Sequence, residues 1–149
     1  TVFVLADSLD GTMARLSGTT SRWGAFLDST LDRIADAAIF GGLTMWFAQQ
    51  GDLLGVALTL AALVLGQVVS YTRARAEGLG AQAAVGIAER TERLIVVLVA
   101  TALVGGGLPV EVLLVAMGVL AVASAVTVVQ RLLVVRSQLR GESAARLEP

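Results

Sequence analysis

The chain has 149 residues, of which 56% are hydrophobic and 15% charged, and its formal net charge is −1. The mean hydropathy of +0.79 is high for a soluble domain, where about half of the residues are apolar, and the near-neutral charge gives no sign of nucleic-acid binding. Cysteine and histidine are absent, which excludes disulfides and the usual zinc sites, so any metal must be held by oxygen, as magnesium and manganese are.

The apolar residues gather into four runs that are nearly free of charge. With its flanking turn, each run reaches the roughly 20 residues that a helix needs to cross a bilayer. Four such runs leave no room for a separate soluble domain. The runs are 39–48, 53–70, 94–108 and 112–129.

In chain order, residues 1 to about 16 read as the end of a helix that lacks its beginning. Ser21 is a good N-cap for a second helix, which runs to about Gln49. Further helices are expected over about 53–76, 88–105 and 110–139, separated by turns and glycine-bearing loops. We therefore predict one all-α transmembrane domain over 1–149, truncated at its N-terminus. It would be a polytopic helix bundle with about five spans here, of six in the full-length protein.

Every basic residue is an arginine, and the arginines lie near alternate ends of the predicted helices. They flank the first turn, the loop after the third helix and the end of the fifth, whereas the loops at 49–52 and 105–111 carry none. The positive-inside rule places the arginine-bearing ends in the cytoplasm. We expect a multi-pass protein of the cell (inner) membrane whose active site faces the cytoplasm.

Five aspartates lie in or beside these helices, where each costs about 2.5–3.5 kcal/mol at the centre of a span. Their spacings of three and four residues place each set along one helix face, and a short turn can bring the two faces together. Carboxylates that close would raise one another's pKa unless cations lay between them. Two divalent metals about 3.5–4 Å apart would meet that need. The five are Asp7, Asp10, Asp28, Asp32 and Asp36.

The spacing alone leaves two other interpretations open. The aspartates could form a proton relay or cation pathway, as in pumps and channels. They could also pair structurally with arginines nearby in the sequence, namely Arg15, Arg22 and Arg33.

The stretch 7–32 resembles the pattern D-x2-D-G-x2-A-R-x8-G-x3-D-x3-D of the CDP-alcohol phosphotransferase family. A chance match to all of its fixed positions would occur roughly once in 10⁸ chains of this size, which favours the two-metal enzyme over the relay. The resemblance covers about the first fifth of the chain. The matching residues are Asp7, Asp10, Gly11, Ala14, Arg15, Gly24, Asp28 and Asp32.

The resemblance implies a role for each aspartate of the motif. Asp7 and Asp28 would bridge two divalent cations, Mg²⁺ or Mn²⁺. Asp10 would be a ligand of one cation and Asp32 a ligand of the other. Asp32 would also be the general base that takes the proton from the attacking hydroxyl, a task for which a modest base suffices because the metal acidifies the alcohol.

The resemblance also implies a site for CDP-diacylglycerol. Gly11 and Ala14 would let the cytidine diphosphate approach the backbone, and Gly24 would keep the facing helix near. Arg15 would pair with the diphosphate, and Ser21 would offer it a hydroxyl at a helix N-terminus. The small residues could instead serve helix packing, and Ser21 could be only a cap.

Arginines at three predicted helix ends could form a phosphate-binding pocket, which would indicate an acceptor alcohol that carries a phosphate. They could instead merely flank the membrane and bind lipid headgroups. Segments 24–33, 71–77 and 88–93 resemble bacterial phosphatidylinositol-phosphate synthases of the family. That resemblance implies inositol-phosphate binding by Arg73, Arg93 and Arg131.

The expected reaction, a step of phospholipid biosynthesis, transfers the phosphatidyl group of CDP-diacylglycerol to inositol phosphate and releases CMP. The expected partners are these substrates, membrane lipids and a second copy of the chain in a homodimer. The alternatives are a phosphatidylglycerol-phosphate synthase or another family enzyme with a different acceptor. A non-enzymatic ion or proton transporter is the remaining alternative.

Overall fold

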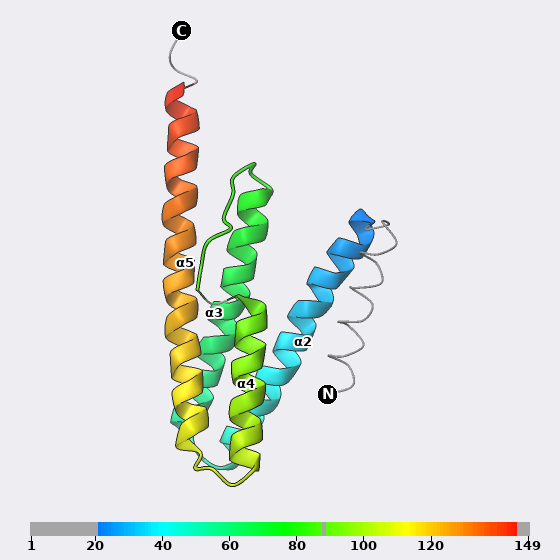
Figure 1. Cartoon of the computed structure of the whole chain (residues 1–149), viewed down its shortest axis with the longest axis vertical. Coiled ribbons are helices and arrows are strands. Elements are labelled where there is room, and N and C mark those ends of the chain that lie inside the picture. Colours follow the sequence, from blue (N-terminus) through cyan, green and yellow to red (C-terminus); the bar gives the residue numbers. More distant parts are fainter. Residues whose placement is uncertain (1–20, 88, 146–149) are drawn as a thin grey trace. The chain divides into compact units, whose positions relative to one another are not determined.

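The structure is a computed structural model that describes residues 21–87 and 89–145, with side chains up to residue 141. This part of the chain contains helices and no strand (Figure 1). The all-α prediction is therefore confirmed, while the helix predicted over residues 1–16 lies outside the described residues. The helices are α2 (Arg22–Gln49), α3 (Leu53–Glu77), α4 (Arg90–Gly105) and α5 (Glu111–Ala145).

Side chains at the helix starts explain why two of the helices begin where they do. Ser21 precedes α2, and its Oγ accepts a hydrogen bond from the Gly24 N–H at 2.9 Å, so the predicted N-cap is confirmed. Asp52 caps α3 in the same way through the Gly55 N–H at 2.9 Å. Each cap satisfies an amide that has no partner within the helix. Between α2 and α3, Gly51 has a φ of +72°, which only glycine adopts without strain.

Two helix boundaries differ from the sequence prediction. The last helix was expected to end near residue 139, but α5 continues to Ala145. Its final turns contain Arg, Glu and Ala, which favour helix, and one Gly141 costs only about 1 kcal/mol there. The fourth helix begins at Arg90 rather than at 88, and Glu89 immediately before it has an extended backbone.

The chain divides into two compact units, residues 1–35 and 36–149. In the first unit, the described residues form the N-terminal part of α2. In the second unit, α5 packs against both α3 and α4, and Figure 1 shows α3 and α5 running side by side.

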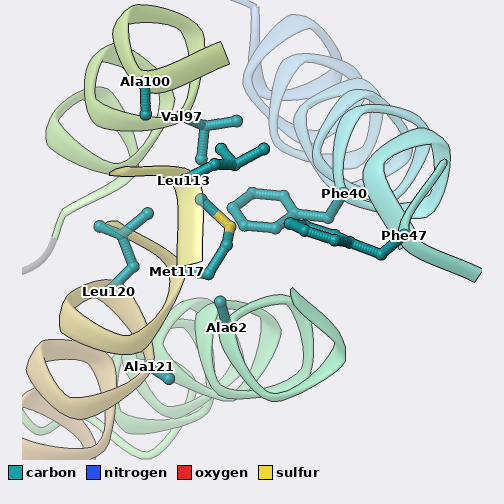
Figure 2. Packing of buried hydrophobic residues seen from close by; sticks show 9 residues of the cluster. All are labelled: Phe40, Phe47, Ala62, Val97, Ala100, Leu113, Met117, Leu120 and Ala121. Carbon is teal, nitrogen blue, oxygen red and sulfur yellow. The ribbon is translucent and has the colours of Figure 1, made fainter. Parts of the chain in front are cut away.

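The core of the second unit contains residues from all four helices. Phe47 is fully buried, and its ring occupies the space that a Cβ on Gly55 would need. Apolar side chains gain little from packing on one another rather than on lipid, so close fit is the main stabilising term in a membrane. Figure 2 shows the core residues Phe40, Phe47, Ala62, Val97, Ala100, Leu113, Met117, Leu120 and Ala121.

Two of the described helices are long and apolar enough to cross a membrane, by length and composition: Leu53–Glu77 and Glu111–Gly141. The predicted count of five spans is not confirmed. α4 has only 16 residues, about 24 Å of helix, which is shorter than a hydrocarbon core of about 30 Å. The long helix α2 carries the charged Asp28, Asp32, Arg33 and Asp36 between its seventh and fifteenth residues.

The connection between α3 and α4 contains an extended segment, residues 81–87, that lies along α5. The Gln82 backbone N–H donates to Gln138 Oε1, and Gln138 Nε2 donates to the Gln82 carbonyl, each at 2.9 Å. Five residues further, the Ile87 N–H donates to Thr127 Oγ1 at 3.2 Å. The two contacts are five residues apart in the segment and eleven residues apart in α5. An extended chain covers about 17 Å in five residues, and a helix covers the same length in eleven. The 81–87 segment therefore runs antiparallel to α5.

Polar side chains on one face of α5 satisfy the backbone of the 81–87 segment. Thr127, Arg131 and Gln138 are spaced by four and seven residues and so share that face, and each bonds to the segment. Irregular backbone at membrane depth is tolerated where protein covers it. Ala81 and Ala83 are buried accordingly. The segment leads from the end of α3 to the start of α4, as Figure 1 shows.

Candidate active site

Two predicted metal ligands, Asp28 and Asp32, lie one turn apart in α2. Asp28 is exposed and Asp32 is half-buried. The nearest Asp32 oxygen, Oδ2, is 3.8 Å from Nη2 of Arg33. Spacing by four residues puts both carboxylates on the same side of the helix. This all-oxygen pair suits a hard divalent cation.

The structure does not assemble a complete metal site within its described range. No group of three or more acidic, histidine or cysteine side chains gathers among the described residues. The other residues predicted for the metals and for CDP-diacylglycerol lie outside that range, so their roles stay predictions. They are Asp7, Asp10, Gly11, Ala14 and Arg15.

Ser21 and Gly24 are within the described residues, and they interact with each other. Ser21 Oγ accepts the Gly24 N–H, and a Cβ on Gly24 would stand 3.1 Å from that Oγ. Gly24 therefore leaves room for the cap, a reason that the sequence did not suggest. Whether the exposed Ser21 hydroxyl also meets the nucleotide stays a prediction.

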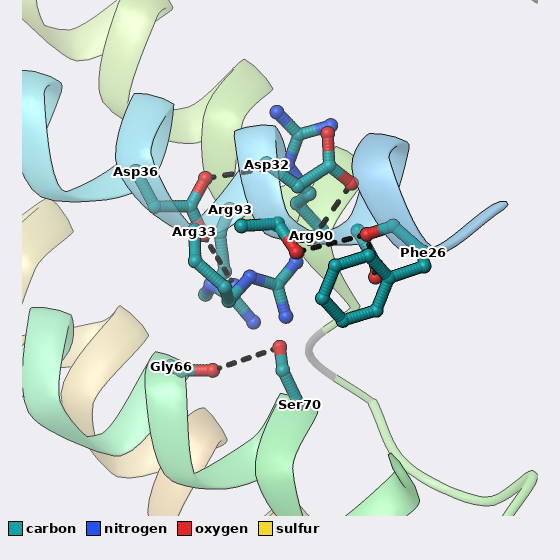
Figure 3. A network of polar contacts seen from close by, with 10 residues as sticks. Phe26, Asp32, Arg33, Asp36, Gly66, Ser70, Arg90 and Arg93 are labelled. Carbon is teal, nitrogen blue, oxygen red and sulfur yellow. Dashed lines mark hydrogen bonds and ion pairs between the residues drawn. The ribbon is translucent and has the colours of Figure 1, made fainter. Parts of the chain in front are cut away.

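A second polar centre, in the second unit, joins Asp36 of α2 to two arginines of α4 (Figure 3). Asp36 Oδ2 accepts from Arg93 Nη2 at 3.0 Å, and Asp36 Oδ1 accepts from Arg90 Nε at 3.3 Å. Asp36 is 3% exposed and Arg93 1%. One buried carboxylate thus binds guanidinium groups from two positions in the first turns of α4.

The Arg93 guanidinium lies directly against the backbone of α3. A Cβ added to Gly66 would stand 3.0 Å from Arg93 Nε and 3.1 Å from its Cζ. Such distances are tighter than most Cβ contacts, so a side chain at position 66 would push the guanidinium aside by a few tenths of an ångström. Ser70, one turn further along α3, donates to the Gly66 carbonyl at 3.2 Å. Figure 3 shows Ser70 and Gly66 on α3 beside the arginine cluster.

The pairing of Asp36 with Arg93 was not predicted from the sequence. Asp36 was grouped with the metal-binding aspartates because of its spacing, and the structural partners considered were arginines close to it in the chain. A signal was present in α4, where arginines occupy the first two turns. Cations are disfavoured at the positive end of a helix dipole, so those arginines required an anionic partner.

Arg131, predicted for the acceptor, is 2% exposed and bonds to main-chain oxygens. Its Nε donates to the Val85 carbonyl at 2.8 Å, and its Nη1 donates to the Val69 carbonyl at 2.6 Å. It therefore connects α5 to both the 81–87 segment and α3. Arg73, by contrast, is exposed and pairs with Glu77 one turn later at 3.0 Å.

Two of the three arginines predicted to bind the acceptor, Arg93 and Arg131, are buried. Guanidinium groups bind phosphate oxygens through paired, charged hydrogen bonds, so these side chains have the chemistry that a phosphate ligand needs.

A shallow apolar hollow of about 370 Å³ lies on α5 between residues 118 and 126. No polar surface lines it, so it suits hydrocarbon and not a charged headgroup. Its lining residues are Ile87, Gly118, Val119, Val122, Ala123 and Val126.

Comparison with known proteins places the chain in a family. The family model for CDP-alcohol phosphatidyltransferases matches residues 1–130. The chain therefore belongs to the CDP-alcohol phosphatidyltransferase family, as the motif between Asp7 and Asp32 indicated.

Among curated proteins, similar relatives are phosphatidylinositol phosphate synthases. The one from Streptomyces avermitilis is 51% identical over 152 residues, which cover 97% of this chain and 62% of that protein. The one from Cutibacterium acnes is 51% identical over 144 residues, which cover 91% of this chain and 70% of that protein. The chain thus spans less than two thirds of the Streptomyces relative.

Similar solved structures are those of the phosphatidylinositol phosphate synthase of Mycobacterium tuberculosis. The crystal structure with CDP-DAG bound has a TM-score of 0.82 and 47% identity, and the match covers 90% of this chain and 69% of that one. The structure with manganese and citrate has the same TM-score and identity, and the match covers 90% and 66%.

Proposed function

We propose that this chain is the catalytic domain of a phosphatidylinositol-phosphate synthase. It would transfer the phosphatidyl group of CDP-diacylglycerol to inositol phosphate and release CMP. The observation that carries the proposal is the complete eight-position motif between Asp7 and Asp32, in a chain about half identical to synthases of that name. The solved relative that binds CDP-DAG supports the choice of phosphatidyl donor.

The aspartates of the motif would hold two divalent cations, Mg²⁺ or Mn²⁺. Asp28 and Asp32 fit this role by their oxygen donors and their spacing in α2, and Asp7 and Asp10 would complete the set. The solved relative with manganese supports a cation of this kind. When bound, the cations would offset charge on the phosphate oxygens and acidify the attacking alcohol.

The transfer would be a direct displacement at phosphorus. The acceptor hydroxyl oxygen forms a bond to the β-phosphorus, and the bond from that phosphorus to the bridging oxygen breaks, so CMP leaves with the bridging oxygen. Asp32 takes the hydroxyl proton. A direct displacement needs no covalent intermediate, and the usual thiol and imidazole nucleophiles are absent because the chain has no cysteine and no histidine.

The phosphate of the acceptor would be bound by Arg73, Arg93 and Arg131. The planar guanidinium groups of these arginines can each bind two phosphate oxygens, and the burial of Arg93 and Arg131 would shield such an ion pair from water. CDP-diacylglycerol would contact Gly11, Ala14, Arg15, Ser21 and Gly24.

The protein would be a multi-pass membrane protein whose active site faces the cytoplasm. The two apolar helices and the arginine-free connections at 50–52 and 106–110 support that orientation through the positive-inside rule. The apolar hollow on α5 would accommodate lipid chains. The assembly would be a homodimer.

The direct test is CMP release by the full-length protein in detergent or liposomes. CDP-diacylglycerol and Mg²⁺ or Mn²⁺ are supplied with either inositol phosphate or glycerol 3-phosphate. The expected result is metal-dependent release with inositol phosphate only, lost in Asp32→Asn, with Asp52→Asn as the matched control in a helix cap. Release with glycerol 3-phosphate would contradict the proposed acceptor, and ion flux without CMP release would indicate a transporter.

A further inference from the structure

We propose that Asp36 is a positioning residue for the acceptor, acting through Arg93. Gly66, which has no side chain, leaves the space in which the Arg93 guanidinium lies. This inference rests on the proposed function, since it takes Arg93 as a ligand of the acceptor phosphate. Asp36 itself touches neither substrate nor metal in the proposal.

The first argument is geometric. Arg93 is a long side chain with four rotatable bonds, and it would lose much rotamer freedom on binding a phosphate. Here its end is fixed beforehand on two sides. Asp36 Oδ2 binds Nη2 at 3.0 Å, and the backbone of Gly66 lies against Nε and Cζ. Holding a binding group in place before the ligand arrives lowers the cost of binding.

The second argument concerns the cost of the cluster. A buried ion pair is seldom a net source of stability, because desolvation of the two charges offsets most of their attraction. Arg90 and Arg93 also lie at the N-terminal end of α4, where the helix dipole disfavours cations. The cluster of Asp36, Arg90 and Arg93 therefore adds little to the stability of the fold. Its presence is better explained if it holds the Arg93 guanidinium in position for a ligand.

The third argument is the depth at which the cluster lies. Gly66 is eleven residues before the end of α3, which is about 17 Å along the helix. The 81–87 segment leads the chain back over a similar length before α4 begins, and this brings Arg93 level with Gly66. An arginine held this deep by a carboxylate can meet a phosphate that has entered the bundle rather than one at its rim.

The experiment measures CMP release and acceptor binding for the full-length protein in detergent. Inositol phosphate is varied at saturating CDP-diacylglycerol, and calorimetry gives its affinity without the nucleotide. Asp36→Asn should raise the KM for inositol phosphate about tenfold, with kcat and the KM for CDP-diacylglycerol changed less than about twofold. Gly66→Ala keeps every charge and should raise the same KM about threefold, because its Cβ would shift the guanidinium by a few tenths of an ångström from its position beside Asp36.

Two matched controls separate positioning from general damage. Gly42→Ala also adds a methyl group to a helix glycine, but nothing lies within 4 Å of that Cβ, so its KM should not change. In an Arg93→Gln background, Asp36→Asn should add no further increase in KM, because its effect passes through Arg93. An independent, multiplicative increase in the double variant would overturn the inference.

The outcomes also distinguish this inference from the proposed function. If the wild type turns over inositol phosphate while both Asp36→Asn and Gly66→Ala keep its KM, only the positioning role is overturned. Equal losses in every kinetic parameter, accompanied by a lower melting temperature, would also overturn it. If Asp36→Asn fails to fold, Gly66→Ala alone decides. A wild type that binds no phosphorylated alcohol overturns both proposals.

Discussion

Arg93 and Arg131 are both almost fully buried, both were predicted from the sequence to bind the acceptor, and they are held in different ways. Arg93 is paired with a carboxylate, Asp36. Arg131 is bound by two neutral carbonyl oxygens, those of Val85 and Val69. An ion pair offsets part of the charge that it positions, whereas carbonyls position a guanidinium and leave its full charge in place. Arg131 is therefore the better source of attraction for an anion, and Arg93 the better oriented ligand.

The largest expected effect is on the charged pair. Arg93→Leu removes the closer partner of the buried Asp36 carboxylate, which should cost about 3 kcal/mol of stability, at the lower end of the usual range because Arg90 remains at 3.3 Å. Adding Asp36→Leu to this variant should recover much of the loss, since the buried carboxylate is then removed as well and the remaining partner, Arg90, is partly exposed. Thermal unfolding in detergent measures the stability of both variants. A double variant less stable than Arg93→Leu would contradict the view that Arg93 is held by the Asp36 carboxylate.

The next effect concerns the carbonyl-bound arginine. Arg131→Lys keeps the charge but cannot reach two carbonyls in the same fixed geometry, so it should lose about 2 kcal/mol, the worth of one to two charged hydrogen bonds. Its KM for inositol phosphate should rise less than that of Arg131→Gln, which loses the charge as well. Equal KM values for the two variants would indicate that Arg131 acts only as a structural link.

A similar effect is expected where the 81–87 segment touches α5. Gly86 has a φ of +140°, and a Cβ there would overlap the Thr127 methyl group. Gly86→Ala should therefore displace the segment, at a cost of about 1–3 kcal/mol, and make it easier to cleave in limited proteolysis. Adding Thr127→Ser removes the methyl group and keeps the hydroxyl that accepts from Ile87, so the double variant should be partly restored. Unchanged cleavage in Gly86→Ala would contradict the close fit.

The smallest effect is expected at the exposed end of the segment. Gln138→Leu removes two hydrogen bonds to Gln82, each worth about 1 kcal/mol at most because water can replace them. Amide exchange at Gln82 should accelerate, while the KM for inositol phosphate stays near the wild-type value. A large increase in that KM would show that the whole segment, and not only its contact with Arg131, positions the acceptor site.

Much of the fold could be predicted from local sequence. Ser21 and Gly51 mark the start and end of α2 through capping and turn chemistry, and the apolar runs located α3 and α5. These features depend on neighbours within one or two turns, which a sequence displays directly. The number of spans did not follow in the same way, because α4 is short and α2 mixes apolar with charged residues.

The sequence by itself determined the family, since the motif from Asp7 to Asp32 fixes residue types at set spacings along the chain. It also showed that the basic residues gather at one set of helix ends. Only the tertiary structure decided the partners of the buried arginines. Asp36 and Arg93 are 57 residues apart, and Arg131 and Val69 are 62 apart. Which residues become partners depends on the distance that the 81–87 segment covers along α5 before α4 begins. No local sequence pattern predicts that distance.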